Sequence, residues 1–203
     1  MSIEYVIGDC REVLKTLPDN SFDIVFTSPP FKDEDVPSEY WSWYDAFFRE
    51  AYRVAGKVLI IIHSATKMQE HIVRYPAKRV MIWGKGQVKY AWRYNPIFVY
   101  QKSDEYRVNK YIWSDVFGVA PVVGSQKAHV YQDPLLLYTT VLKMFKGCTS
   151  VLDPFAGSGT TAKACRELQL DCILMEQNPE YEPLIKERIG ANIPELSTFE
   201  VVL

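Results

Sequence analysis

The sequence predicts an α/β domain with a mostly parallel β-sheet that helices cover on both faces. Apolar stretches of strand length alternate along the chain with stretches of helical periodicity. Glycine- or proline-containing loops follow two of the apolar stretches directly, as is typical where parallel strands end at a binding site. The chain of 203 residues shows no internal repeat, low-complexity tract or linker, so one domain is expected.

In the first half of the chain, short apolar runs predict the strands and longer amphipathic stretches predict the helices. The run 58–62 is purely aliphatic, which is typical of a strand buried on both faces. Pro18 closes the first helical stretch, and Gly56 is expected to end the second. The predicted strands are 3–7, 22–26, 58–62, 79–83 and 97–101, and the predicted helices are 10–17 and 41–54.

The second half begins with an irregular stretch, 103–130, that contains Gly118, Pro121 and Gly124. A leucine-rich stretch then predicts a helix that Gly147 stops, and strands and helices alternate after it. The predicted helices are 134–145, 160–168 and 179–189, and the predicted strands are 150–152, 171–175 and 198–203.

Composition excludes several classes of protein. Apolar residues make up 48% and charged residues 24%, with a net charge of −2, so a disordered chain is excluded. The longest aliphatic run has five residues, far fewer than the roughly 20 of a membrane span. The start of the chain lacks the pattern of a secretory signal. Four cysteines without Cys-x-x-Cys spacing and three scattered histidines predict a cytoplasmic, metal-free protein.

One stretch departs from this acidic average. Residues 78–110 contain eight Lys or Arg, two acids and seven aromatic residues. Such interleaving suits binding of a phosphate backbone with stacking of bases. On the pattern alone, a half-buried strand pair at a sheet edge, with solvated charges and core aromatics, is favoured. The candidate nucleic-acid-binding residues in this stretch are Lys85, Lys89, Trp92 and Arg93.

A glycine-containing loop, residues 153–161, joins a predicted strand to a predicted helix. Gly157 and Gly159 permit a tight turn, and the helix N-terminus presents free N–H groups to a polar ligand. Glu176 ends the next strand, 23 positions after Asp153, where a carboxylate suits ribose hydroxyls. The alternative for Glu176 is a solvent-facing acid in the first turn of the following helix.

A second loop, Thr27-Ser28-Pro29-Pro30-Phe31, also follows a strand. Two consecutive prolines make the backbone rigid and remove two N–H donors, which leaves carbonyl groups free to accept hydrogen bonds from an amino group. Phe31 offers a flat apolar face. The alternative is a simple strand terminator followed by a core phenylalanine.

The two loops together resemble the S-adenosylmethionine-dependent amino-methyltransferases of nucleic acids. Ser28-Pro29-Pro30-Phe31 is similar to the catalytic motif of that family, and the loop 153–161 is similar to its cofactor loop. The catalytic motif comes first here, which is the circularly permuted order of the family's β group. Weaker similarities are Gly8-Asp9-Cys10 to the adenine segment, Glu176-x-Asn178-Pro179-x-Tyr181 to the ribose segment, and His129-x4-Pro134 to the entry of the cofactor half.

The resemblance implies a single Rossmann-like class I methyltransferase domain. It divides the chain into a catalytic half (1–102), a short connection in place of a target-recognition domain (103–128) and a cofactor half (129–203). Asp133 stands where the family usually has Lys before proline. The implied catalytic residues are Ser28, Pro29, Pro30 and Phe31. The implied S-adenosylmethionine-binding residues are Asp9, Cys10, His129, Asp153, Phe155, Gly157, Ser158, Gly159, Thr160, Thr161 and Glu176.

In the mechanism that the resemblance implies, the Pro29 carbonyl and Ser28 accept hydrogen bonds from an exocyclic amino group, which then attacks the methyl group directly. Phe31 stacks on the unpaired base. A Ser-Pro-Pro motif favours cytosine N4, and the lack of a reading domain favours structured RNA narrowly over DNA. The alternatives are an N4-cytosine or N6-adenine DNA methyltransferase that depends on a dimer or a partner, a protein or small-molecule methyltransferase, and an inactive nucleic-acid-binding partner.

Overall fold

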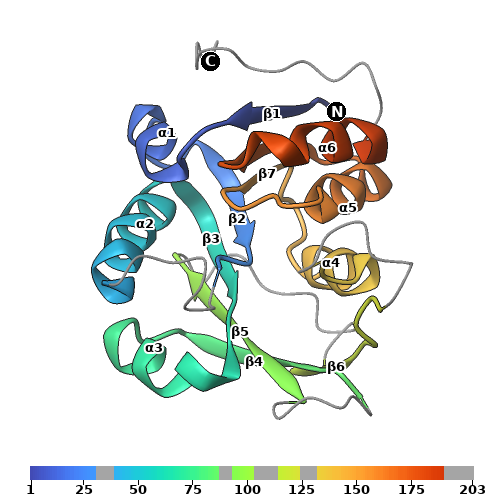
Figure 1. Cartoon of the computed structure of the whole chain (residues 1–203). Coiled ribbons are helices and arrows are strands. Elements are labelled where there is room, and N and C mark those ends of the chain that lie inside the picture. Colours follow the sequence, from blue (N-terminus) through green and yellow to red (C-terminus); the bar gives the residue numbers. More distant parts are fainter. Residues whose placement is uncertain (31–38, 87–92, 103–113, 124–131, 190–203) are drawn as a thin grey trace.

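The computed structural model describes residues 1–30, 39–86, 93–102, 114–123 and 132–189. One sheet of eight strands runs through this part of the molecule (Figure 1). The strands are β1 (Ile3–Ile7), β2 (Phe22–Thr27), β3 (Ala55–Ile62), β4 (Arg79–Gly84), β5 (Tyr94–Gln101), β6 (Val116–Gly118), β7 (Ser150–Asp153) and β8 (Asp171–Glu176). The helices are α1 (Cys10–Thr16), α2 (Tyr40–Val54), α3 (Met68–Arg74), α4 (Leu135–Leu142), α5 (Thr160–Leu168) and α6 (Glu182–Ile189).

The sheet is mostly parallel, as the sequence predicts. Its strand order is β1-β8-β7-β2-β3-β5-β4-β6. The five strands from β1 to β3 in this order run parallel to one another. Strand β5 is antiparallel to both of its neighbours, and β6 pairs in parallel with β4.

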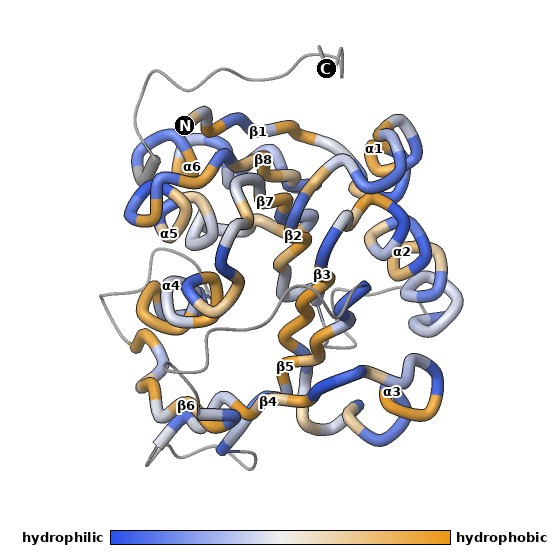
Figure 2. Tube along the Cα trace, turned by 180° about the vertical axis from the view of Figure 1, so that it is seen from behind, coloured by the Kyte–Doolittle hydropathy of each residue, from blue (hydrophilic) through white to orange (hydrophobic). Residues whose placement is uncertain are grey.

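Helices cover both faces of this sheet, so the expected layering is confirmed. Side chains of α4, α5 and α6 belong to one apolar cluster, which includes Leu137, Cys165 and Ile185. Side chains of α1 and α2, such as Leu14 and Tyr44, belong to a second cluster, and α3 packs against it. Figure 2 shows hydrophobic residues along β2, β3 and β5, whereas the helices carry both hydrophobic and hydrophilic residues. The central strands therefore lie between two apolar layers.

The connections diverge at one point in the sheet. After β7 the chain passes through α5 to β8 on one side, and after β2 it passes through α2 to β3 on the other side. Because β7 and β2 are neighbours, the loops that follow them separate at the carboxyl ends of the strands. A crevice forms at such a switch point in an open α/β sheet.

Most predicted elements are confirmed within a few residues, and the differences have physical reasons. Helix α3 lies in a stretch for which no element is predicted, and β6 lies inside the stretch predicted to be irregular. Because β6 pairs with β4, the β4–β5 pair is not at the sheet edge. Its aromatic residues Trp83, Phe98 and Tyr100 are buried, which confirms the half-buried strand interpretation for them. The predicted strand 198–203 lies outside the described residues.

Gly56 does not end a helix as predicted, because β3 already begins at Ala55. A Cβ atom at Gly56 would lie 3.0 Å from the backbone oxygen of Asn20 and 3.2 Å from that of Phe22. We therefore expect Gly56→Ala to lower the free energy of unfolding by about 1–3 kcal/mol, because backbone must move to relieve the overlap. Denaturant unfolding measures this, with Gly118→Ala as the control, since nothing lies within 4 Å of a Cβ atom there. Equal losses for the two variants would contradict the close-approach explanation.

Three further observations concern membrane-spanning helices, metal-binding side chains and the cysteines. No helix within the described ranges is long and apolar enough to cross a membrane. In the same residues no group of three or more His, Cys, Asp and Glu side chains is arranged to hold a metal ion. All four cysteines are buried and free.

Candidate active site

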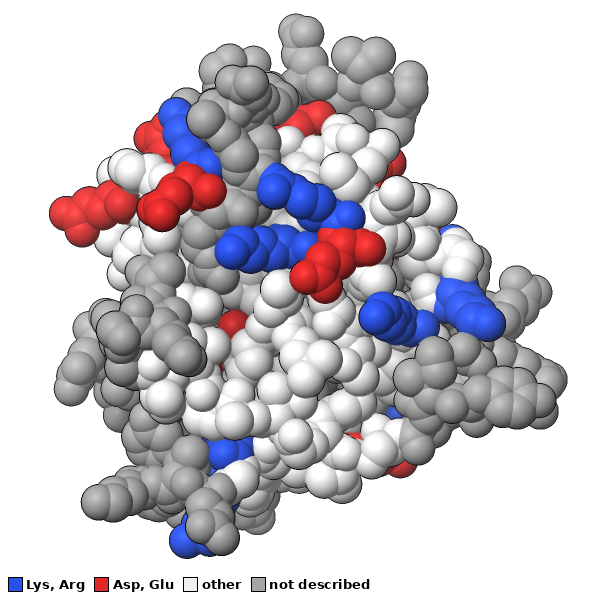
Figure 3. Space-filling model, turned by 90° about the vertical axis from the view of Figure 1, so that its right-hand side faces the viewer, with Lys and Arg blue, Asp and Glu red and all other residues white. Residues whose placement is uncertain are grey.

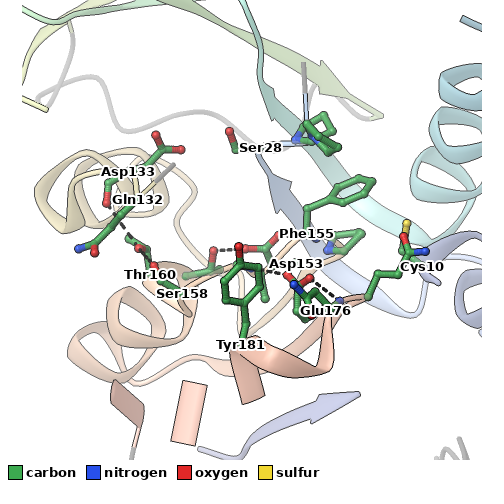
Figure 4. Close-up of a pocket in the computed structure, with 18 of the residues that line it drawn as sticks. Cys10, Ser28, Gln132, Asp133, Asp153, Phe155, Ser158, Thr160, Glu176 and Tyr181 are labelled. Carbon is green, nitrogen blue, oxygen red and sulfur yellow. Dashed lines mark hydrogen bonds between the residues drawn. The ribbon is translucent and has the colours of Figure 1, made fainter. Parts of the chain in front are cut away.

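A cleft of about 890 Å³ opens at the carboxyl ends of β1, β2, β7 and β8 (Figure 4). Its wall includes the loop after β7, the Ser28-Pro29-Pro30 segment after β2, and residues after β8. Gln132 and Asp133, which precede α4, close one side. The cleft therefore lies at the switch point of the sheet, and the topology brings both predicted loops together there.

The glycine loop adopts the tight turn that its sequence predicts. Gly157 has a φ of 50°, and Gly159, the N-cap of α5, has a φ of 75°. Both values lie in the left-handed region, which glycine adopts without strain. The Ala156 amide donates a hydrogen bond to the Met175 carbonyl at 2.9 Å, which is a typical length for such a bond. This bond fixes the loop against β8. Ser158 is almost fully buried, and its Oγ lies 3.4 Å from Thr160 Oγ1.

Asp153 lies beneath this loop and is only 2% exposed. Its Oδ1 accepts hydrogen bonds from Thr27 Oγ1 at 2.7 Å and from the Phe155 amide at 3.0 Å, and Oδ2 accepts one from Thr161 Oγ1. Burial raises the pKa of the carboxyl to about 6, although these hydrogen bonds act in the opposite direction. Asp153 thus joins the end of β2, immediately before Ser28, to the glycine loop and α5.

Glu176, at the end of β8, also supports the glycine loop. Its Oε2 accepts a hydrogen bond from the Gly157 amide, and its Oε1 accepts one from the Asn178 amide, both at 2.8 Å. Each carboxylate oxygen can accept a second hydrogen bond, so the group retains capacity for ligand hydroxyls. The solvent-facing alternative for Glu176 is wrong, because the side chain is half-buried and lines the cleft.

The Gly8-Asp9-Cys10 segment contributes in part. Cys10 and Arg11 line the cleft. The Asp9 carboxylate instead caps α1 by accepting from the Arg11 amide at 2.9 Å, and it forms an ion pair with the Arg11 guanidinium at 2.5 Å. Arg11 lowers the pKa of Asp9 through this bond. The structure therefore places Asp9 as a support for Arg11 rather than as part of the cleft wall.

Two cleft residues come from positions that the sequence patterns did not single out. Trp43, on α2, lines the cleft with its ring centroid 5.8 Å from that of Phe155. Its spacing of four residues from the buried Phe47 is typical of an apolar helix face, so the pattern indicated core packing alone. Tyr138, on α4, also lines the cleft and stacks on Phe26 with a centroid distance of 4.4 Å.

The candidate nucleic-acid-binding residues are described only in part. The Lys85 amide donates to the Arg93 carbonyl at 2.8 Å, so the two residues lie opposite each other where β4 and β5 meet. The charge of Lys85 lowers the pKa of the Asp133 carboxyl, and Asp133 lines the cleft. Arg93 is exposed. Phe31, Lys89, Trp92 and His129 lie outside the described residues.

The cleft itself is acidic. Asp133, Asp153 and Glu176 line it, and its one lining arginine, among the described residues, is Arg11, which is paired with Asp9. Carboxylates in a partly buried cleft favour a cationic ligand. On the face over α5 and α6, Lys and Arg lie next to Asp and Glu with a broad uncharged area beside them (Figure 3). This face therefore presents no continuous basic band among the residues drawn in colour.

Comparison with known proteins gives a consistent result. The model of the DNA methylase family of N6 and N4 methyltransferases matches residues 22–187. The type II methyltransferase M.MwoI of Methanothermobacter wolfeii is 26% identical over 243 residues, covering 96% of this chain and 36% of that protein. The chain thus spans about a third of the length of that relative.

Solved structures share the fold. The PvuII DNA methyltransferase (cytosine-N4-specific) superimposes with a TM-score of 0.75 at 18% identity, covering 96% of this chain and 89% of that one. The complex of M1.HpyAVI with S-adenosylmethionine superimposes with a TM-score of 0.68 at 23% identity, covering 92% and 99%. These similarities confirm the Rossmann-like α/β architecture.

Proposed function

The chain belongs to the DNA methylase family of N6 and N4 amino-methyltransferases, and we propose that it methylates the exocyclic N4 amino group of cytosine in DNA. The observation that carries the proposal is the cleft in which Ser28-Pro29-Pro30 faces the glycine loop. An acceptor segment for an amino group and a loop for a methyl donor meet there. The expectation of an RNA substrate is not supported, because the matching family is described as DNA methylase and the PvuII structural neighbour is a DNA methyltransferase by its title.

The family uses S-adenosylmethionine, and the residues of the cleft fit it. This compound supplies a methyl group on a positively charged sulfur, and the acidic lining of the cleft suits that charge. Glu176 would accept hydrogen bonds from the ribose hydroxyls, and the Gly157-to-Gly159 turn would follow the chain of the cofactor. Cys10, Phe155 and Trp43 line the cleft and would supply an apolar wall for the adenine ring.

We propose cytosine rather than adenine as the target base because Ser28 is the first residue of the motif, and a Ser-Pro-Pro motif favours cytosine N4. The Pro29 carbonyl and the Ser28 side chain would accept hydrogen bonds from the two amino hydrogens. These bonds localise the nitrogen lone pair, which is otherwise delocalised into the ring, and hold it for in-line attack. One structural neighbour, the PvuII enzyme, is cytosine-N4-specific by its title, which supports this choice. Adenine N6 in DNA is the second candidate.

The site is expected to receive a base that has left its duplex. The alignment with M.MwoI extends over 243 positions, more than the 203 residues of this chain, so that relative has residues within the aligned region that this chain lacks. A difference of this kind is what would result if 103–128 took the place of a target-recognition domain between the halves 1–102 and 129–203. Sequence specificity would then come from a second copy or a partner.

The experiment that tests the function is transfer from tritiated S-adenosylmethionine to amplified, and hence unmethylated, genomic DNA of the source organism. Ribosomal RNA is assayed in parallel, and both are digested to nucleosides for mass spectrometry. We expect label in N4-methyldeoxycytidine. Label in N6-methyldeoxyadenosine would favour the second candidate, and label confined to RNA would overturn the choice of DNA.

Lys85 and Arg93 are proposed to contact phosphates of the bound strand. We expect the double variant Lys85→Gln/Arg93→Gln to weaken DNA binding and to reduce the slope of log affinity against log salt by about 2, because each lost duplex phosphate contact removes about 0.9. Fluorescence anisotropy over a salt series measures this. Lys15→Gln/Lys146→Gln is the matched control, because these exposed lysines precede β2 and β7 and so lie at the opposite end of the sheet. An equal fall in slope for both pairs would remove the surface near Lys85 as the binding site.

A further inference from the structure

A carboxylate, Asp133, faces the serine of the catalytic motif across the cleft. Asp133 lies just before α4, far from Ser28 in the sequence, yet Figure 4 shows its carboxylate and the Ser28 hydroxyl pointing toward each other. Tyr138 Oη donates a hydrogen bond to Asp133 Oδ2 at 3.1 Å, and Thr160 Oγ1 contacts the Asp133 carbonyl at 3.4 Å. These contacts from α4 and α5 fix the position of Asp133 on the cleft wall.

A serine hydroxyl is both a donor and an acceptor, and this limits its use toward an amino group. To accept a hydrogen bond from the amino group, Ser28 must direct its own hydrogen elsewhere. A carboxylate only accepts hydrogen bonds, so a carboxylate on the far side of Ser28 attracts the hydroxyl hydrogen of Ser28 to itself.

We propose that Asp133 is a positioning residue for methyl transfer: it takes the hydroxyl hydrogen of Ser28 and thereby presents Ser28 Oγ as an acceptor to the target amino group. The inference rests on the proposed function. A serine hydroxyl alone can turn either its hydrogen or its lone pair toward the amino group. With Asp133 accepting the hydrogen, the lone pair of Ser28 Oγ would face the amino group.

The surroundings of Asp133 suit this role. Burial raises the pKa of its carboxyl to about 6, while the hydroxyls of Tyr138 and Ser28 and the charge of Lys85 lower it, and the charge of Asp153 raises it further. Tyr138 belongs to α4, Ser28 and Lys85 directly follow β2 and β4, and Asp153 ends β7. Burial also raises the pKa of Tyr138, which therefore stays protonated as a donor. Asp133 is thus ionised near neutral pH and loses its charge as the pH falls through about 6.

The pair of Ser28 and Asp133 also gives a route for the proton that the amino nitrogen must lose after methyl transfer. As the N–C bond forms, the S–C bond breaks and its electron pair stays on the sulfur, which becomes neutral. The amino nitrogen is then cationic. It passes one proton to Ser28 Oγ while the hydroxyl proton of Ser28 passes to Asp133, and Asp133 releases it to water. All atoms and charges balance without any further reactant.

The test compares the wild type with Asp133→Asn, Asp133→Glu, Ser28→Ala and the double variant Ser28→Ala/Asp133→Asn. Single-turnover transfer to unmethylated DNA is measured between about pH 5 and pH 8, with calorimetric S-adenosylmethionine affinity and thermal unfolding for each variant. We expect the transfer rate of the wild type to rise as the pH increases through about 6. Asp133→Asn should lose this rise and should transfer the methyl group roughly tenfold more slowly than the wild type. Asp133→Glu should restore part of the rate. The double variant should be no slower than Ser28→Ala, since Asp133 acts through Ser28.

An unchanged rate and pH profile in Asp133→Asn would overturn the proposal. So would a loss of S-adenosylmethionine affinity equal to the loss of rate, because Asp133 would then act on the cofactor. A second measurement does not depend on turnover: NMR titration of the Asp133 carboxyl carbon, assigned with Asp133→Asn. Ser28→Ala should raise the pKa of Asp133, and the absence of any change would refute the pairing. A wild type that transfers no methyl group, with the Ser28–Asp133 coupling intact, would refute the proposed function alone.

Discussion

Replacing Asp153 with alanine is expected to lower the free energy of unfolding by about 3–5 kcal/mol and to abolish methyl transfer. The carboxylate is 2% exposed and accepts hydrogen bonds from Thr27, Thr161 and the Phe155 amide. Alanine leaves three donors without their acceptor, two of them buried hydroxyls. Each buried donor costs about 1–3 kcal/mol, partly relieved by rearrangement of the hydroxyls. Transfer is lost because Thr27 precedes Ser28 and Phe155 begins the glycine loop, so both halves of the site lose their anchor.

Asp153→Asn is the matched control, because it keeps the shape and one carbonyl acceptor but removes the charge. The pKa of Asp153 is raised to about 6 in the folded state, so ionisation near pH 7 destabilises the fold and the neutral amide relieves that cost. We therefore expect Asp153→Asn to unfold within about 1 kcal/mol of the wild type and to retain transfer within roughly tenfold. Denaturant unfolding and calorimetric titration of S-adenosylmethionine measure the two effects. If Asp153→Asn folds normally yet binds the cofactor as weakly as Asp153→Ala, the charge of Asp153 holds the cofactor, as the sequence resemblance implied.

The fold could be predicted largely from local patterns. Aliphatic runs such as 58–62 are buried on both faces in the structure, and such a run predicts a central strand from sequence alone. Helix α3 was not predicted because it has seven residues and follows a short 3-10 turn at Ala65–Lys67, which leaves too few positions for a periodic signal. Strand β6 has three residues and exists through its pairing with β4, a contact that no local pattern contains.

The candidate site likewise contains residues that local sequence patterns predict and residues that they do not. The Ser28-Pro29-Pro30 segment and the glycine loop carry their signal in adjacent residues, so both could be predicted. Trp43 and Tyr138 enter the cleft through the packing of α2 and α4, which the sequence does not display. Asp9 shows the converse: the motif implied cofactor contact, but its carboxylate caps α1 and pairs with Arg11.

The second large effect expected is on the pH dependence of stability, and it comes from a buried histidine on the other side of the sheet from α4. His71 is fully buried and stacks on Phe98, with ring centroids 3.9 Å apart and planes within 4°. Its Nε2 lies 2.7 Å from Tyr100 Oη, which itself donates to the Tyr75 carbonyl at 3.1 Å. Because Tyr100 has one hydrogen, Nε2 of His71 must be the donor, so the proton is on Nε2. Nδ1 finds no hydrogen-bond partner among the described residues.

Protonation of Nδ1 would therefore place an unpaired charge in the core, and burial lowers the pKa of His71 to about 2. Because the folded pKa is below the unfolded value of about 6.5, the stability that neutral His71 contributes is complete above pH 6.5 and is lost as the pH falls toward 2. We expect the free energy of unfolding of the wild type, relative to His71→Gln, to fall by about 2 kcal/mol between pH 7 and pH 5, since glutamine does not titrate. Taking this difference cancels the contributions of Asp133, Asp153 and His63, which titrate in both proteins. Urea unfolding at the two pH values gives the answer, and a difference that does not change with pH would mean that the folded protein accepts the imidazolium form of His71 without penalty.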